Sequence, residues 1–161
     1  LDKESEMAKP NNTNYLQPTK FLLTFPEIAD TIFFCQKVNI PGISVSESLR
    51  QVPNVDLYTP GTRISYNTLD VEFSVNEDLS AWRVIYDWMK TNTLDNKFKY
   101  KNVDATLTVL SNLNNPKMRV RYSNVFPISL GDVEFDTRLS ADTHVSANAT
   151  FRFDFYDIEV L

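Results

Sequence analysis

The stretch that decides the fold is residues 68–89, which read "TLDVEFSVNEDLSAWRVIYDWM". Residues 68–75 alternate strictly between polar and apolar side chains. This alternation is typical of a strand in an antiparallel sheet that buries one face and exposes the other. From Asn76 onward the apolar residues recur at three- and four-residue spacing instead. The stretch therefore predicts a β-strand that leads directly into an α-helix.

The helix is expected over about residues 77–91. Asn76 is the expected N-cap, and Glu77 and Asp78 put negative charge in the first turn, where the helix dipole favours it. The residues expected to pack against the core fall on one face and are Leu79, Trp82, Ile85, Tyr86 and Met89. Trp88 extends the apolar surface sideways, which leaves both a core role and an interface role open for the helix.

On either side of residues 68–89 the chain carries further strand signals and no second helix signal. Short segments rich in aliphatic and aromatic residues predict strands at residues 20–25, 31–38, 105–111, 119–126, 128–135 and 147–160. Residues 1–18 are polar and predict a flexible N-terminal arm, and residues 19–161 predict a single domain. The expected fold is mainly β, a two-sheet sandwich or partial barrel of about seven or eight strands with one flanking helix. The sequence leaves open whether the natural chain starts at Leu1 or Met7.

Two Pro-Gly pairs, Pro41-Gly42 and Pro60-Gly61, hold two of the three glycines in the chain. At the first pair Pro presets φ for one turn position and Gly accepts a positive φ at the next, which predicts a type II turn. Residues 43–59 lie between the pairs and read "ISVSESLRQVPNVDLYT". Their apolar residues are unevenly spaced, and Pro53 interrupts them. We expect an extended loop, or a loose hairpin, that reaches a neighbouring molecule.

The composition argues against most catalytic and nucleic-acid-binding classes. The net charge of −5 and the pI of about 4.9 disfavour a surface that grips nucleic acid. Cys35 is the only cysteine and is expected to be a buried thiol, and His144 is the only histidine, so neither a disulfide nor a zinc site is expected. There is also no glycine-rich phosphate loop. We therefore expect no enzyme activity, cofactor or metal.

Two weaker signals have a structural explanation that we prefer. Residues 97–101, "KFKYK", alternate lysine with aromatic residues, and we interpret them as an exposed strand edge kept soluble by lysine rather than as a nucleic-acid stripe. Asp70 and Glu72 lie two residues apart on the polar face of the predicted strand. Such a pair is usually a solvated surface pair and not an acid–base pair of a hydrolase.

Two longer stretches, "FFCQKVNIPGI" and "TPGTRISYNTLDVEFSVNEDLSAWRVIYDWM", carry a family resemblance. Together with the order of the elements, they resemble the tail tube proteins of contractile-tailed, T4-like bacteriophages, which are relatives of the tube proteins of type VI secretion systems. The resemblance runs from about Phe21 to the C-terminus. It implies a two-sheet β-barrel with a helix on its side. It also implies hexameric rings that stack into a hollow tube, with one sheet of each subunit lining the lumen.

The resemblance assigns roles to particular residues. Residues 43–59 would reach the adjacent ring, and the apolar residues buried between rings would be Ile43, Val45, Leu49, Val52, Val55 and Leu57. The hinges of this loop would be Pro41, Gly42, Pro60 and Gly61. A lumen lined by carboxylates would let DNA slide without binding it, and the candidates for that wall are Asp70, Glu72 and Asp154.

The function implied by the resemblance is that of a structural virion protein of the inner tail tube, through which the genome is ejected. The implied partners are further copies of the chain, a tail sheath, a baseplate and a tape-measure protein. The implied location is the virion tail, and the host cytoplasm during assembly. The alternatives are a baseplate-proximal initiator ring, the tube protein of a related injection system, and a ligand-binding β-sandwich. The last would need exposed aromatics on a concave face, whereas Trp82 and Trp88 both lie on the predicted helix.

Overall fold

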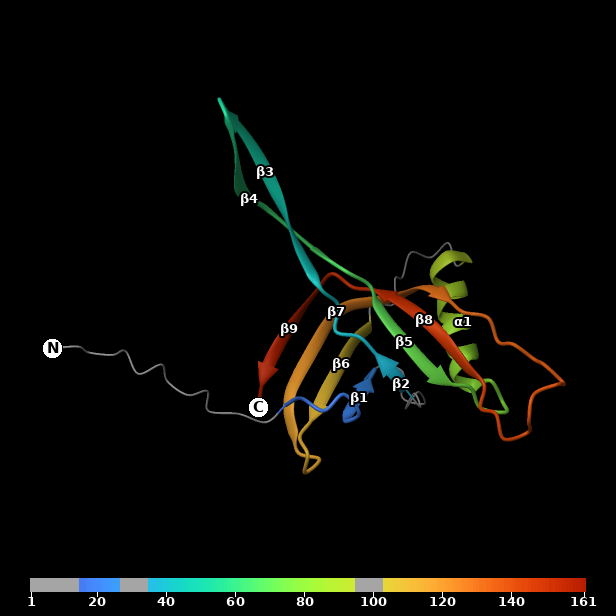
Figure 1. Cartoon of the computed structure of the whole chain (residues 1–161). Coiled ribbons are helices and arrows are strands. Elements are labelled where there is room, and N and C mark those ends of the chain that lie inside the picture. The colour runs from blue at the N-terminus through green and yellow to red at the C-terminus, as the bar shows by residue number, and fades with distance from the viewer. Residues whose placement is uncertain (1–14, 27–34, 95–102) are drawn as a thin grey trace.

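The computed structural model describes residues 15–26, 35–94 and 103–161 (Figure 1). These residues form nine strands and one helix: β1 Phe21–Thr24, β2 Cys35–Val38, β3 Ile43–Val52, β4 Val55–Tyr66, β5 Leu69–Ser74, α1 Ser80–Leu94, β6 Val103–Leu110, β7 Pro116–Leu130, β8 Ser146–Arg152 and β9 Phe155–Val160. The expected mainly β fold with one helix is confirmed. Most of the predicted N-terminal arm, and the "KFKYK" segment at residues 97–101, lie outside the described residues.

The long strand β7 joins two sheets. One side of β7 pairs with β6, and the other side pairs first with β9 and then with β8. The order β1-β6-β7-β9 forms one sheet, and the order β7-β8-β5-β2 forms the other. All of these pairs are antiparallel. The fold is therefore an open barrel in which one strand passes from the first sheet into the second.

The passage between the sheets takes place at Asn124, which has a φ of 64°. Asn tolerates this left-handed conformation better than most residues. Its backbone N–H donates to Asp104 Oδ1 at 3.2 Å, and its Nδ2 donates to Asp154 Oδ2 at 2.7 Å. The break expected between the strands 119–126 and 128–135 is wrong, because β7 continues through Pro127, which pairs with Phe151 of β8. The strand expected over residues 147–160 is divided instead, into β8 and β9.

The core lies between the two sheets. The apolar positions of β5 are buried, and its polar positions face outward, as the alternation of residues 68–75 predicts. They meet buried residues of β6, β7 and β8 in one continuous cluster. Helix α1 covers one side of this cluster, and the Trp88 ring lies 6.4 Å from Phe25 and 6.0 Å from Phe151.

The start of the helix differs from the expectation. Helix α1 begins at Ser80, and residues 76–79 form a turn in which the Leu79 N–H donates to the Asn76 carbonyl at 2.9 Å. Leu79 has a φ of 52°, and its own carbonyl accepts the first helical hydrogen bond, from Arg83. Glu77 and Asp78 therefore precede the helix, and Leu79 occupies the cap position expected for Asn76.

The packing face of the helix is also rotated from the expected one. Ile85 and Trp88 are buried, whereas Tyr86 is 42% exposed, so its assignment to the core is wrong. The remaining expected packing residues, Leu79, Trp82 and Met89, are half-buried. Trp82 donates from Nε1 to the Gly131 carbonyl at 3.1 Å and stacks on the Tyr86 ring at 5.4 Å. In the part of the chain that is described, no helix has the length and apolar character needed to cross a membrane.

Candidate assembly interface

A long hairpin projects from the barrel (Figure 1). Strands β3 and β4 pair with each other from Ile43↔Tyr66 to Val52↔Val55 and form a sheet of their own. The sequence predicted an extended loop or loose hairpin over residues 43–59. The segment is instead a two-stranded antiparallel ribbon that continues to residue 66.

The turn of this hairpin lies at Pro53-Asn54 and not at a Pro-Gly pair. Asn54 has a φ of 74°, whereas none of the three glycines has a positive φ. Proline followed by a residue with positive φ is the signature of a type II turn. The prediction of a type II turn at Pro41-Gly42 is therefore wrong. Pro53 does not interrupt the segment but forms the turn of the hairpin together with Asn54.

Pro60 and Gly61 lie inside β4 and are not a hinge. The register of the hairpin shifts between Val45, which pairs with Ile64, and Glu47, which pairs with Pro60. Residues 61–63 of β4 therefore stand opposite Ser46 alone, and β4 is the bulged strand. A Cβ atom at Gly61 would lie 2.6 Å from the Ser46 carbonyl oxygen. Gly61 is therefore needed because the two backbones approach closely at this bulge, and not because it provides freedom to bend.

The base of the hairpin is held against the barrel by Pro41, Gly42 and two tyrosines. Pro41 is buried, and its carbonyl accepts a hydrogen bond from the Tyr156 hydroxyl at 2.9 Å. The Asn67 N–H donates to the Gly42 carbonyl at 3.0 Å. The Tyr66 ring at the end of β4 lies 5.3 Å from the Tyr156 ring. Strand β9 therefore sets the direction in which the hairpin leaves the barrel.

The hairpin exposes an unusual amount of apolar surface. The six residues that the resemblance assigned to the contact between rings are 41–58% exposed: Ile43, Val45, Leu49, Val52, Val55 and Leu57. Two further exposed apolar residues, Tyr58 at 64% and Ile64 at 54%, were not predicted. Tyr58 lies inside the segment considered above and Ile64 lies beyond it, and no simple alternation in the sequence marks either of them. So many exposed apolar side chains make the hairpin the candidate interface, since an isolated two-stranded hairpin is at best marginally stable in water.

The opposite end of the barrel carries an acidic connection, residues 131–145, between β7 and β8 (Figure 1). Strand β5 starts near the base of the hairpin and ends at Ser74, which pairs with Ser146 directly after this connection. The sequence predicted strand through residue 135, but β7 ends at Leu130. Asp136 accepts hydrogen bonds from the Arg138 guanidinium, which lowers the pKa of Asp136.

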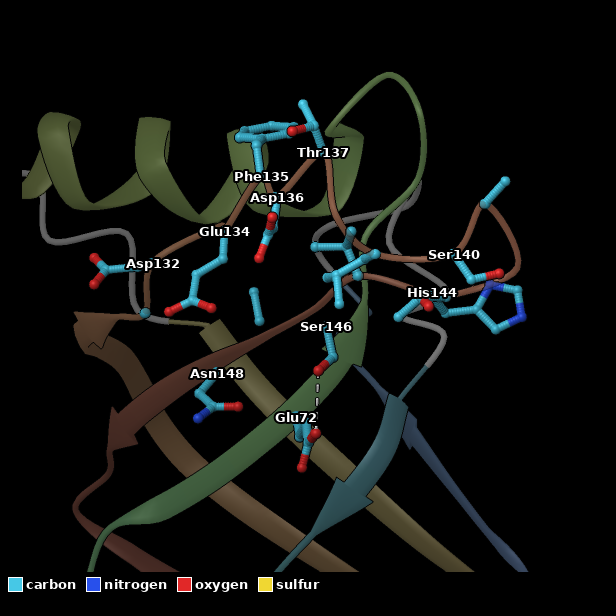
Figure 2. A pocket seen from close by; sticks show the side chains of 16 residues that line it. Glu72, Asp132, Glu134, Phe135, Asp136, Thr137, Ser140, His144, Ser146 and Asn148 are labelled. Carbon is cyan, nitrogen blue, oxygen red and sulfur yellow. Dashed lines mark hydrogen bonds between the residues drawn. The ribbon is translucent and has the colours of Figure 1, made fainter.

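The acidic connection borders a concavity that also includes Glu72 of β5 (Figure 2). The Ser146 hydroxyl donates to Glu72 Oε1 at 3.3 Å. Phe135 is 83% exposed on the same connection. The two ends of the barrel therefore differ, because one presents an apolar hairpin and the other presents a mainly acidic loop.

Two of the three expected lumen-wall residues lie on one strand, and the third lies just beyond the end of β8. Asp70 and Glu72 both lie on the outward face of β5. Glu72 stands opposite Lys37 of β2, so this face is mixed in charge. Asp154 lies at the break between β8 and β9, where its carboxylate accepts from Asn124. The geometry therefore gives Asp154 a structural role in the bend of β7.

The described residues offer little for catalysis. Cys35 is half-buried rather than fully buried, and its thiol donates to the Lys37 carbonyl at 3.4 Å. Burial raises the pKa of Cys35 to about 11, so the reactive thiolate is scarce at neutral pH. His144 lies exposed on the acidic connection. Over residues 15–26, 35–94 and 103–161 no group of three or more His, Cys, Asp and Glu side chains is arranged to hold a metal ion.

Comparisons with known proteins point to one superfamily. No protein-family model matches the chain. The tail tube terminator protein of Enterobacteria phage T4 is 26% identical over 165 residues, which cover 91% of this chain and 90% of that protein. The tube-terminating cap of the anti-feeding prophage superimposes with a TM-score of 0.69 at 16% identity, over 98% of this chain and 99% of that chain. A chain of the anti-feeding prophage baseplate gives a TM-score of 0.70 at 12% identity, over 92% and 98%.

The chain has the fold of the tail tube superfamily, and its resemblance to tail tube proteins is confirmed. Within this class, the relative that is similar in sequence over nearly the full length is a tube terminator. The structural likenesses establish the fold alone, and they include a baseplate chain as well as a terminating cap.

Proposed function

We propose that this chain is a structural tail protein that forms a ring at the end of an inner tail tube and terminates it. The observation that carries the proposal is an exposed apolar hairpin on a barrel of the tail tube fold. The sequence similarity to a tube terminator over 91% of the chain supports the terminating role over that of the repeating tube subunit. We therefore favour the role of tube terminator over the role of repeating tube subunit that the sequence favoured.

The two different ends of the barrel suit a terminal ring. A ring that stacks without limit needs two ends that complement each other, whereas a terminator needs only one end that binds the tube. The hairpin end has the apolar surface that such binding requires. The acidic connection at the other end would face away from the tube. Repulsion between acidic loops would disfavour the stacking of a second ring in a head-to-head arrangement.

The energetics favour burial of the hairpin residues in the assembly. Full burial of one aliphatic side chain contributes about 1.5–3 kcal/mol relative to full exposure. The side chains from Ile43 to Leu57 that we assign to the interface are already about half-buried, so each would contribute roughly half of that. Several such side chains in each copy of a hexameric ring provide the affinity needed to hold the ring on a tube end.

The remaining roles follow from the position of the ring. Its lumen would continue the tube, so DNA would pass through without specific binding during ejection. Asp70 and Glu72 remain candidates for the lumen wall. Neighbouring partners would be the tube, the tail sheath and the tape-measure protein, and the location would be the virion tail. The chain would act structurally and not as an enzyme.

Negative-stain electron microscopy tests this proposal. The purified chain is imaged across a concentration series, alone and with tubes assembled from the tube subunit of the same particle. A terminator forms single rings that bind one end of each tube and stop its elongation. Long tubes formed by the chain alone would identify it as the repeating subunit and overturn the proposal. A chain that leaves tube ends bare and tube growth unchanged would also overturn it.

A second candidate, a ring at the baseplate end of the tube, is favoured by the likeness to a baseplate chain. Both candidates predict single rings, so the position must be measured. A C-terminal affinity tag labelled with gold on intact tails distinguishes the two ends. Label at the end distal to the baseplate supports the terminator, and label at the baseplate supports the initiator.

A further inference from the structure

The two faces of the β3–β4 hairpin have opposite charge. Directly opposed residues of an antiparallel pair share one face, and the faces alternate along each strand. Arg50 stands opposite Leu57. Arg63 has no directly opposed residue, but it comes just before Ile64, which pairs with Val45 on the other face, so local alternation places Arg63 on the face of Arg50. Glu47 stands opposite Pro60, and Asp56 stands opposite Gln51, which places both carboxylates on the other face. We call these the basic face and the acidic face.

Apolar side chains accompany the charges on both faces. The basic face carries Val52, Val55 and Leu57 near the tip of the hairpin. The acidic face carries Val45, Leu49, Tyr58 and Ile64 along its length. All of these side chains are substantially exposed. A ribbon with apolar surface on both faces requires cover on both, and contact with one flat partner would leave half of that surface in water.

The four charges lack partners within the hairpin. Arg50, Arg63, Glu47 and Asp56 are exposed, and none takes part in an ion pair among the described residues. Their directly opposed residues, where the register gives one, are uncharged. Each face has one charge near the tip and one nearer the base. The two faces are therefore complementary in charge. When two hairpins lie side by side with their tips together, the charges of one face lie at about the same height as the opposite charges of the other.

We propose that hairpins of neighbouring copies pack on each other, with the basic face of one hairpin against the acidic face of the next. This inference rests on the ring of the proposed function. A ring of identical copies uses a heterologous contact, in which two different patches of one subunit meet their complements on its two neighbours. The two hairpin faces meet that requirement, and stacked β-ribbons bury their apolar side chains at a spacing of about 10 Å. The hairpins together form a collar that engages the tube end with its tips.

Charge reversal tests the pairing of the faces. One variant, Arg50→Glu with Arg63→Glu, makes both faces acidic, and a second, Glu47→Arg with Asp56→Arg, makes both faces basic. Each variant alone should form rings only at a protein concentration about tenfold or more higher than the unmodified chain needs, because like charges meet at every contact. An equimolar mixture should restore rings, with the two variants alternating around them. The matched control for the first variant, Arg83→Glu with Lys117→Glu, changes two exposed residues outside the hairpin by the same charge and should leave rings unchanged.

Native mass spectrometry gives the composition of the rings, and circular dichroism verifies that every variant is folded. Mixed rings with equal numbers of both variants support the proposal. Separate variants that form rings as well as the unmodified chain overturn it, and so does a mixture that fails to restore rings. Binding to tube ends is measured separately by electron microscopy. If the unmodified chain caps tubes but the mixture of variants forms no rings, the pairing of hairpins is rejected and the proposed function stands. If the mixture forms rings but the unmodified chain does not bind tube ends, the pairing of hairpins stands and the proposed function is rejected.

Discussion

Gly61 is the residue at which the hairpin has least room for a side chain. An added Cβ would lie 2.6 Å from the backbone carbonyl oxygen of Ser46, and this distance can grow only if the strands separate. At Gly42 the nearest atom is the flexible Asn67 side-chain nitrogen, at 3.2 Å. The two glycines of the Pro-Gly pairs therefore differ in their tolerance of substitution.

Gly61→Ala is expected to open the bulge and loosen the hairpin. Hydrogen exchange should become faster at the amides of β3 and β4, because their ladder is disrupted on either side of Ser46. Stability of the barrel to urea should change by less than about 0.5 kcal/mol, since the hairpin does not pack into the core. Gly42→Ala serves as the control and should leave exchange in the hairpin nearly unchanged. Equal protection in both variants would contradict the close approach at Gly61.

Cys35 should react slowly with thiol reagents. Burial raises its pKa from an ordinary value of 9.0 to about 11, so at pH 8 the thiolate fraction is about 100-fold lower than for a free thiol. The rate of alkylation should rise with pH until about 11, and a urea-unfolded sample is the control. Because the unfolded chain releases this proton first, the contribution of Cys35 to stability falls as the pH rises from about 9 to about 11. A rate at pH 8 equal to that of the unfolded chain would contradict this burial.

At the scale of the elements, the direction of the hairpin depends on Tyr156 of β9. Its hydroxyl donates to the Pro41 carbonyl, and its ring lies against Tyr66 and Tyr122. Tyr156→Phe keeps the ring and removes the hydrogen bond. The expected loss is about 1 kcal/mol in the free energy of unfolding, with faster amide exchange at the base of the hairpin. Tyr58→Phe removes an exposed hydroxyl from the hairpin and should have no measurable effect in urea denaturation. Identical midpoints for the two variants would contradict the anchoring role.

The sequence predicted the elements whose pattern arises from one buried face. The alternation of residues 68–75 identified β5 because the core dictates every second side chain. The helix was located correctly, but its start was placed three residues too early, because the turn through Leu79 depends on a positive φ that no local residue preference indicates. The continuity of β7 through Pro127 depends on pairing with β8, which is distant in sequence and shifts register between Pro127 and Ser129.

The apolar residues of the hairpin were predicted, but the form of the segment was not. All six apolar positions assigned from the resemblance are exposed on the hairpin. The hairpin itself escaped prediction because both of its faces carry apolar residues, so the alternation that marks a half-buried strand is absent. Asp154 is exposed, as the alternation of the last predicted strand indicates, but that alternation gives no sign of a hydrogen-bond partner. Its actual partner, Asn124, is 30 residues away.

At the scale of the whole molecule, the hairpin packs little against the core of the barrel, so its residues contribute little to the stability of the barrel. The core cluster contains no residue of β3, and only Tyr66 of β4 packs against it. Changes on the outer part of the hairpin should consequently separate folding from assembly. This separation is testable at Val55, which is 58% exposed beside the turn and is assigned both to the contact with the tube and to the basic face.

Val55→Asp is expected to give a folded chain that neither forms rings efficiently nor binds tube ends. The substitution removes no buried contact, so the melting temperature should stay within about 2 °C of the original. Burial of the new carboxylate in an apolar contact would carry a desolvation cost of several kcal/mol, enough to reduce binding by about 100-fold or more. Leu113→Asp, at an 82% exposed position in the turn between β6 and β7, is the matched control and should assemble normally. Sedimentation and electron microscopy of tube ends measure both variants. If Val55→Asp caps tubes as well as Leu113→Asp, the tip of the hairpin lies outside the interface, and the apolar surface on its flanks must have another partner.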